Sequence, residues 1–146
     1  MRQVVTLKVN GFENQITMTL AAVSNISGTM RLYLSPDGRC HSLVRAETTK
    51  YEDVPVVTLK DFFAKQRITK VDLVKMDIEG AEYDIMYHIE DDILRKIDRI
   101  SMEYHNLDDK KNNGKALQAF LQQKGLVVDR FESVNHDVGM IYASQK

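Results

Sequence analysis

The stretch VDLVKMDIEGAEYDIM, residues 71–86, constrains the fold of this chain more than any other part of the sequence. It begins as an apolar run of strand length and then passes through an acidic turn that contains a glycine. After the turn, apolar residues recur at helical spacing, and these are Ala81, Ile85, Met86, Ile89 and Ile93. The stretch therefore predicts a strand over 71–76, a tight turn, and a helix.

The rest of the chain alternates strand and helix patterns without a repeat or a linker. A helix is predicted over 2–9, and strands over 15–23 and 29–35 are predicted to form a hairpin. The other predicted elements are an extended run at 54–59, a short helix from Thr58, a strand at 97–105, a helix at 115–124, and strands at 126–133 and 138–144. This order predicts one α/β domain over 1–146, with a mostly parallel sheet that ends in an antiparallel hairpin.

Composition argues against several classes of partner. The net charge of −1 and the absence of a long Lys/Arg block argue against nucleic acid or an anionic membrane. No apolar run is long enough to span a membrane, and the N-terminus has no signal-peptide pattern. The single cysteine, Cys40, suits a reducing compartment. A cytoplasmic protein is therefore predicted.

Four charged residues crowd the turn of the opening stretch: Lys75, Asp77, Glu79 and Glu82. In a structural interpretation, Asp77 caps the helix, Gly80 permits the turn, and Glu82 suits the positive end of the helix dipole. This leaves Lys75, which is predicted to lie in a buried strand, where its ammonium group needs an anion. Spacing leaves two roles open for Lys75, a buried ion pair or a base or substrate clamp.

Glu103 and His105 end the next predicted strand. Ligands of α/β sheets bind at the carboxyl ends of the strands, so this pair is expected to share a rim with Asp77 and Glu79. His105 is either an exposed loop histidine or a general base that a carboxylate holds in the right tautomer. No HxH, CxxC or HExxH spacing is present, so no metal site is predicted. A hydrolase is disfavoured because no nucleophile motif accompanies these residues.

The opening stretch resembles the signature of the FkbM family of S-adenosylmethionine-dependent methyltransferases. The family pattern is an apolar strand followed by Lys, a hydrophobe, Asp, a hydrophobe, Glu, Gly, a small residue and Glu. Lys75, Asp77, Glu79, Gly80 and Glu82 fill its fixed positions.

Other segments are similar to the family in the same order, and the resemblance runs from about Val4 to Tyr142. They are AAVSNISGTMRLYLS, VPVVTLKDFF with Lys60 in place of the usual acid, and ISMEYH, which resembles a strand ending in Glu–x–His.

This resemblance implies a class I methyltransferase-like (Rossmann-like) fold that transfers a methyl group from S-adenosylmethionine to a hydroxyl of a saccharide or similar metabolite. It implies that Asp77 and Glu79 line the mouth of the active site. It also implies two groups of site residues, which are Ala21, Ala22 and Asp77 for the cofactor, and Lys75, Glu103 and His105 for orienting or deprotonating the acceptor.

The chain departs from the family pattern at its front. No D-x-G-x-x-x-G turn is present, so the first two strands of the fold are expected to be missing. The strand at 71–76 would then have an unpaired edge, which predicts a homodimer through that edge. The alternative to an active methyltransferase is a non-catalytic remnant or interaction module that retains the second half of the fold.

Overall fold

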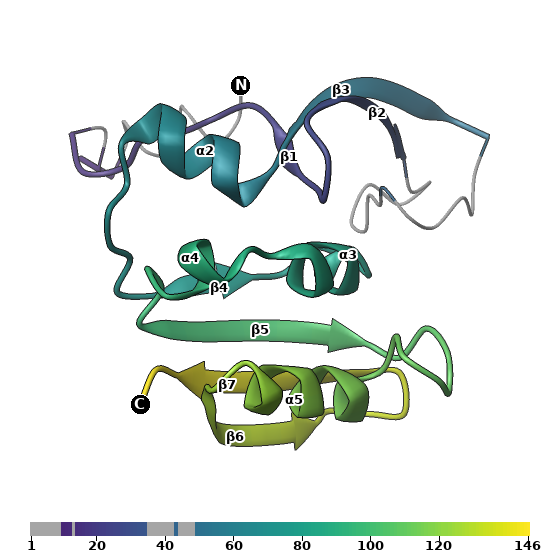
Figure 1. The fold of residues 1–146 in the computed structure, drawn as a ribbon. Helices are drawn as coiled ribbons and strands as arrows, with labels where there is room; N and C mark the ends of the chain where they lie inside the picture. Colours follow the sequence, from purple (N-terminus) through teal and green to yellow (C-terminus); the bar gives the residue numbers. More distant parts are fainter. Residues whose placement is uncertain (1–9, 13, 35–42, 44–48) are drawn as a thin grey trace.

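The computed structural model describes residues 10–12, 14–34, 43 and 49–146, which form an α/β structure with two sheets and four helices (Figure 1). The predicted helix over 2–9 and most of the loop that holds Cys40 lie outside the described residues. The α/β class predicted from the sequence is confirmed.

The first sheet contains β1 (Ala22–Val23), β2 (Gly28–Tyr33) and β3 (Tyr51–Val57). Its order is β1-β3-β2, with β1 parallel and β2 antiparallel to β3. The predicted hairpin between the first two strands is therefore wrong, because β3 lies between them.

The predicted strand over 15–23 shortens to the two residues of β1, and residues 16–21 are irregular. An alternating pattern forms a strand only where a neighbouring strand pairs with its backbone and its apolar side chains are buried. In this segment the apolar side chains face solvent instead, and Leu20 is 96% exposed.

The second sheet contains β4 (Val74–Met76), β5 (Arg99–His105), β6 (Val127–Ser133) and β7 (Val138–Ser144), in the order β4-β5-β7-β6. β4 is parallel to β5, and β6 and β7 form the predicted antiparallel hairpin. Among the described strands, two of five pairings are parallel, so a mostly parallel sheet is not confirmed.

The helices are α2 (Leu59–Gln66), α3 (Glu82–His88), α4 (Asp91–Leu94) and α5 (Gly114–Gln123). The predicted helix from Ala81 to Ile93 breaks at Ile89, whose backbone is extended. The break lets Asp91 and Asp92 lie in the first turn of α4, at its positive end, instead of extending the negative end of α3. The apolar residues on both sides of the break are buried.

One apolar core holds the second sheet and its helices together. Figure 1 shows α3 and α4 in front of β4, and α5 in front of β6 and β7. Met102, Leu117 and Ile141 are fully buried between these layers. Because side chains of a strand alternate between its faces, Glu103 and His105 point away from the side of β5 that carries Met102 and Tyr104.

β4 lies at the edge of its sheet and pairs with β5 alone among the described strands. The homodimer expected through this edge stays a prediction. No helix in the described part of the chain is long and apolar enough to cross a membrane.

Candidate active site

Two consecutive left-handed residues turn the chain from β4 into α3. The φ angle of Glu79 is 51° and that of Gly80 is 98°. Glycine adopts this conformation without a steric penalty, but a glutamate adopts it at a cost of about 1–2 kcal/mol. Such strained residues cluster at functional sites, where the surrounding structure holds them in place. The conformation of Glu79 therefore marks this turn as a candidate for function.

Glu82, not Asp77, satisfies the start of α3. The N-cap residue is Ala81, and no side chain caps the helix there, so the predicted capping role of Asp77 is wrong. Instead, Oε2 of Glu82 accepts a hydrogen bond of 2.8 Å from the backbone N–H of Gly80. The side chain thus folds back onto the turn that precedes its own helix.

The same carboxylate also joins the turn to the end of β5. Oε1 of Glu82 accepts a 2.8 Å hydrogen bond from the backbone N–H of His105 and lies 3.2 Å from Nδ1 of its ring. The exposed fraction of Glu82 is 0%. A carboxylate at that depth is stable only when its oxygens accept hydrogen bonds from well-placed donors, and here both oxygens do.

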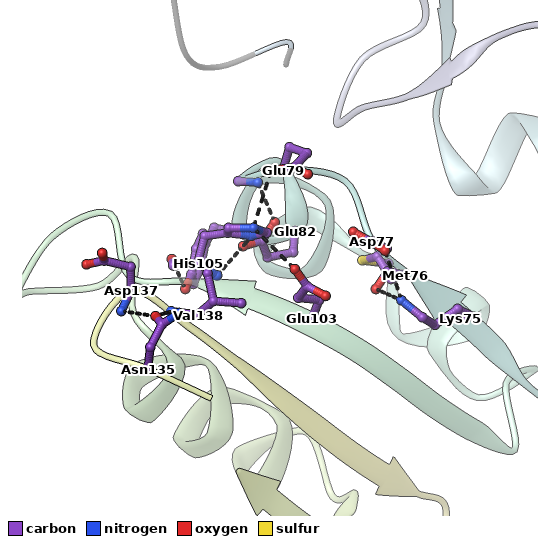
Figure 2. A network of polar contacts seen from close by, with 12 residues as sticks. Lys75, Met76, Asp77, Glu79, Glu82, Glu103, His105, Asn135, Asp137 and Val138 are labelled. Carbon is purple, nitrogen blue, oxygen red and sulfur yellow. Dashed lines mark hydrogen bonds and ion pairs between the residues drawn. The ribbon is translucent and has the colours of Figure 1, made fainter. Parts of the chain in front are cut away.

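The ring of His105 lies among three carboxylates (Figure 2). Nδ1 faces Glu82, while Nε2 lies 3.4 Å from Oε2 of Glu79 and 3.5 Å from Oε1 of Glu103. The hydrogen bond to Glu82 is the main cause that raises the pKa of His105, and burial of the ring opposes it. The buried ring of His105 therefore links the turn after β4 to the end of β5.

Tyr83 holds the backbone of His105. Its hydroxyl donates a 2.7 Å hydrogen bond to the carbonyl of His105, and burial raises the pKa of the phenol. Glu79 and Glu103 remain partly open to solvent, each with 29% of its side chain exposed. The site thus presents two carboxylates at a partly open rim, next to the buried ring of His105.

Lys75 and Asp77 form a separate pair on the same rim. Nζ of Lys75 lies 3.4 Å from Oδ2 of Asp77, and both side chains are 51% exposed. The predicted burial of Lys75 is wrong, because the face of β4 that carries it is open to solvent. An exposed pair of this kind contributes little to stability.

Ala21 and Ala22 lie at the start of β1 in the first sheet, whereas His105 ends β5 of the second sheet. They lead into Ser24, which lines a cavity of about 270 Å³ between the start of α2 and the C-terminal end of α3. Glu82 lies at the N-terminal end of α3, about one helical turn before Ile85, which also lines the cavity. The described structure therefore brings Glu79, Glu103 and His105 together, as their positions in the sequence predict. A cofactor contact of Ala21 and Ala22 stays a prediction.

Within the described ranges, no group of three or more His, Cys, Asp or Glu side chains has the arrangement of a metal site. The carboxylates instead face the ring nitrogens of His105.

The central position of Glu82 was not predicted from the sequence. Its place at a helix start indicates only a favourable interaction with the helix dipole. The available signal was the excess of acids in the turn, because a glutamate in an otherwise buried helix start must have a buried partner.

An α/β fold with acidic and imidazole groups at the ends of neighbouring parallel strands is compatible with a methyltransferase-like domain. The family model described as Methyltransferase FkbM domain matches residues 1–128. The chain therefore belongs to the FkbM methyltransferase family. Comparison with curated proteins and with solved structures gives no significant match.

Proposed function

We propose that this chain transfers a methyl group from S-adenosylmethionine to a hydroxyl group of a saccharide or a similar metabolite, in the cytoplasm. Membership of the FkbM family supports methyl transfer as the reaction class. The observation that carries the assignment to this site is the pair of partly exposed carboxylates, Glu79 and Glu103, held at one ring nitrogen of His105.

The chemistry of the rim fits the cofactor. S-Adenosylmethionine supplies an electrophilic methyl group on a positively charged sulfur, and it carries ribose hydroxyls that donate hydrogen bonds. Asp77 is a half-exposed acceptor at the end of β4, and it would hold the ribose or the sulfonium side of the cofactor. Ala21 and Ala22 shortly precede Ser24, which lines the cavity, and their small side chains would leave room for the adenine.

The acceptor hydroxyl needs a group that takes its proton. Both ring nitrogens of His105 face carboxylates, which favour the protonated ring, and a protonated ring has no lone pair for a proton. Glu79 and Glu103 each have an exposed side that an acceptor hydroxyl can reach. We therefore assign proton removal to this pair, and His105 holds the two carboxylates in position.

Lys75 would orient the acceptor. Its ammonium group lies at the surface beside Asp77, where it can donate a hydrogen bond to a second hydroxyl of a saccharide. The reaction then balances as follows: the acceptor oxygen forms the new bond to the methyl carbon, the carbon–sulfur bond breaks toward sulfur, and the hydroxyl proton goes to a carboxylate.

The proposal is tested by transfer of a labelled methyl group from S-adenosylmethionine to a panel of mono- and oligosaccharides. The double variant Glu79→Gln/Glu103→Gln is expected to lower the rate by about 10²–10⁴, which is typical for loss of a general base. Glu52→Gln, an exposed glutamate of β3, is the matched control and should retain the wild-type rate. Unchanged transfer by the folded double variant would contradict the assignment of the base.

A further inference from the structure

We propose that Glu82 is the positioning residue of this site: its buried carboxylate fixes His105 and, through that ring, sets the separation of Glu79 and Glu103. The inference deepens the proposed function and rests on it for its catalytic part. Its structural part, the link from Glu82 to His105, stands on the contacts alone.

Two backbone N–H groups hold the side chain of Glu82. Oε2 accepts from Gly80 and Oε1 accepts from His105. None of the surface of Glu82 is exposed, so these contacts fix the position of its carboxyl group. Its place in the first turn of α3 adds the positive end of the helix.

A buried carboxylate is stabilised by an adjacent cation, and the ring of His105 is the group that lies against Glu82. The charged groups that face this ring come from three elements: Glu79 from the turn before α3, Glu82 from α3 itself, and Glu103 from β5. Across β5, the residue paired with His105 is Val138 of β7, which carries no charge. The three glutamates are thus the groups that set the charge of the ring.

Glu79 and Glu103 would repel each other if the ring between them were neutral. Nε2 of His105 lies 3.4 Å from an oxygen of Glu79 and 3.5 Å from an oxygen of Glu103, so a positively charged ring attracts both carboxylates. With Glu82 in place, the ring keeps its charge and the pair stays together. Without Glu82, the ring loses its closest carboxylate and the pair separates.

Protonation of His105 makes the stability of the folded protein depend on pH. The folded state raises the pKa of His105 above 6.5, so the folded protein binds this proton more tightly than the unfolded chain does. The contribution of the ring to stability is fully present below pH 6.5. It is lost as the pH rises through the pKa of the folded state.

The test is an NMR titration of the histidine rings of the full chain, which needs neither cofactor nor acceptor. We expect His105 to have both ring nitrogens protonated at pH 7 and to titrate above 6.5. Glu82→Gln should lower that titration midpoint further than Glu79→Gln or Glu103→Gln does, because Glu82 makes the closest contact to the ring. A ring of His105 that is neutral at pH 7 in the wild-type protein would overturn the inference even if no variant folds.

Tyr83→Phe is the matched control. It removes the hydrogen bond to the carbonyl of His105 and leaves every carboxylate at the ring in place. It should therefore lower stability without moving the ring titration. If Tyr83→Phe and Glu82→Gln shift the midpoint of His105 equally, the role of Glu82 is general packing and the inference fails.

The pH dependence of kcat distinguishes a positioning role of Glu82 from a purely structural one. In the pH profile of kcat, Glu82→Gln should move the alkaline limb to lower pH, whereas a purely structural defect would lower kcat at all pH values alike. Absence of methyl transfer in a protein whose His105 titrates as expected would refute the proposed function alone. A titration that Glu82→Gln leaves unchanged would refute the positioning role alone.

Discussion

The strained backbone of Glu79 gives a prediction that can be worked out in detail. Glu79→Gly and Glu79→Ala remove the same carboxylate and the same contact with His105. The two variants differ only in how well the new residue accepts a φ angle of 51°. Their difference in stability therefore isolates the backbone from the charge.

The left-handed conformation costs a residue with a Cβ atom about 1–2 kcal/mol. Glycine avoids that cost, but its greater freedom in the unfolded chain costs about 0.5–1 kcal/mol. The central values of the two ranges differ by about 0.75 kcal/mol, so Glu79→Gly is predicted to be more stable than Glu79→Ala by about that amount. For a chain of this size that corresponds to roughly 1–4 °C in the unfolding midpoint.

In the control, the replacement of alanine by glycine is expected to have the opposite effect on stability. Ala119 is an exposed residue inside α5, where glycine is less favourable than alanine by about 1 kcal/mol. Ala119→Gly should therefore lower the free energy of unfolding, measured in urea with an unchanged m-value. If Glu79→Ala equals or exceeds Glu79→Gly in stability, the left-handed turn is not present in solution, and the argument from strain to function fails.

Three further predictions concern the scaffold around the site. Met102→Ala should lower the free energy of unfolding in urea by about 2–5 kcal/mol, because Met102 is fully buried at the centre of β5; a loss below 1 kcal/mol would contradict that packing. Gly139→Ala should cost about 1–3 kcal/mol in the same assay, since its Cβ would lie 2.2 Å from the backbone oxygen of Glu132; wild-type stability would show that the strands are further apart. Backbone N–H groups lower the pKa of Asp108 from 3.8 to about 2, so its contribution to stability is present above pH 3.8 and is lost as the pH falls toward 2. The deficit of Asp108→Ala relative to wild type, followed by circular dichroism in urea, should therefore shrink over that range, and a deficit independent of pH would contradict it, with Asp109→Ala as the neighbouring control.

Much of the second sheet could be predicted from the sequence, because its signals are local. Thr58 caps α2 as its position suggests, by accepting a hydrogen bond from the backbone of Asp61. The apolar pattern of β5 and the turn before β7 likewise depend on residues that are close in the chain. These elements appear where they were predicted, within a few residues.

The first sheet could not be predicted in the same way, because its order depends on pairing. Nothing in the pattern of residues 15–23 indicates that β3 will take the place between β1 and β2. The burial of Lys75 failed for a related reason. Alternation assigns it to a face of β4, but only the helices that pack on the sheet decide which face is covered.

The site was predicted in part. Adjacent strand ends were expected to bring Glu79, Glu103 and His105 together, and the structure has these contacts. The role of Glu82 needed the structure, because it depends on the backbone N–H of His105, 23 residues further along the chain. Catalytic roles for all of these residues stay predictions.

The measurement that tests the account most directly is calorimetric binding of S-adenosylhomocysteine to the purified chain. The account predicts saturable binding in the micromolar range and weaker binding to Asp77→Asn. Asp53→Asn, an exposed carboxylate of β3, should bind as the wild type does. A folded protein that shows no binding would contradict the proposal that this chain holds the cofactor and transfers its methyl group.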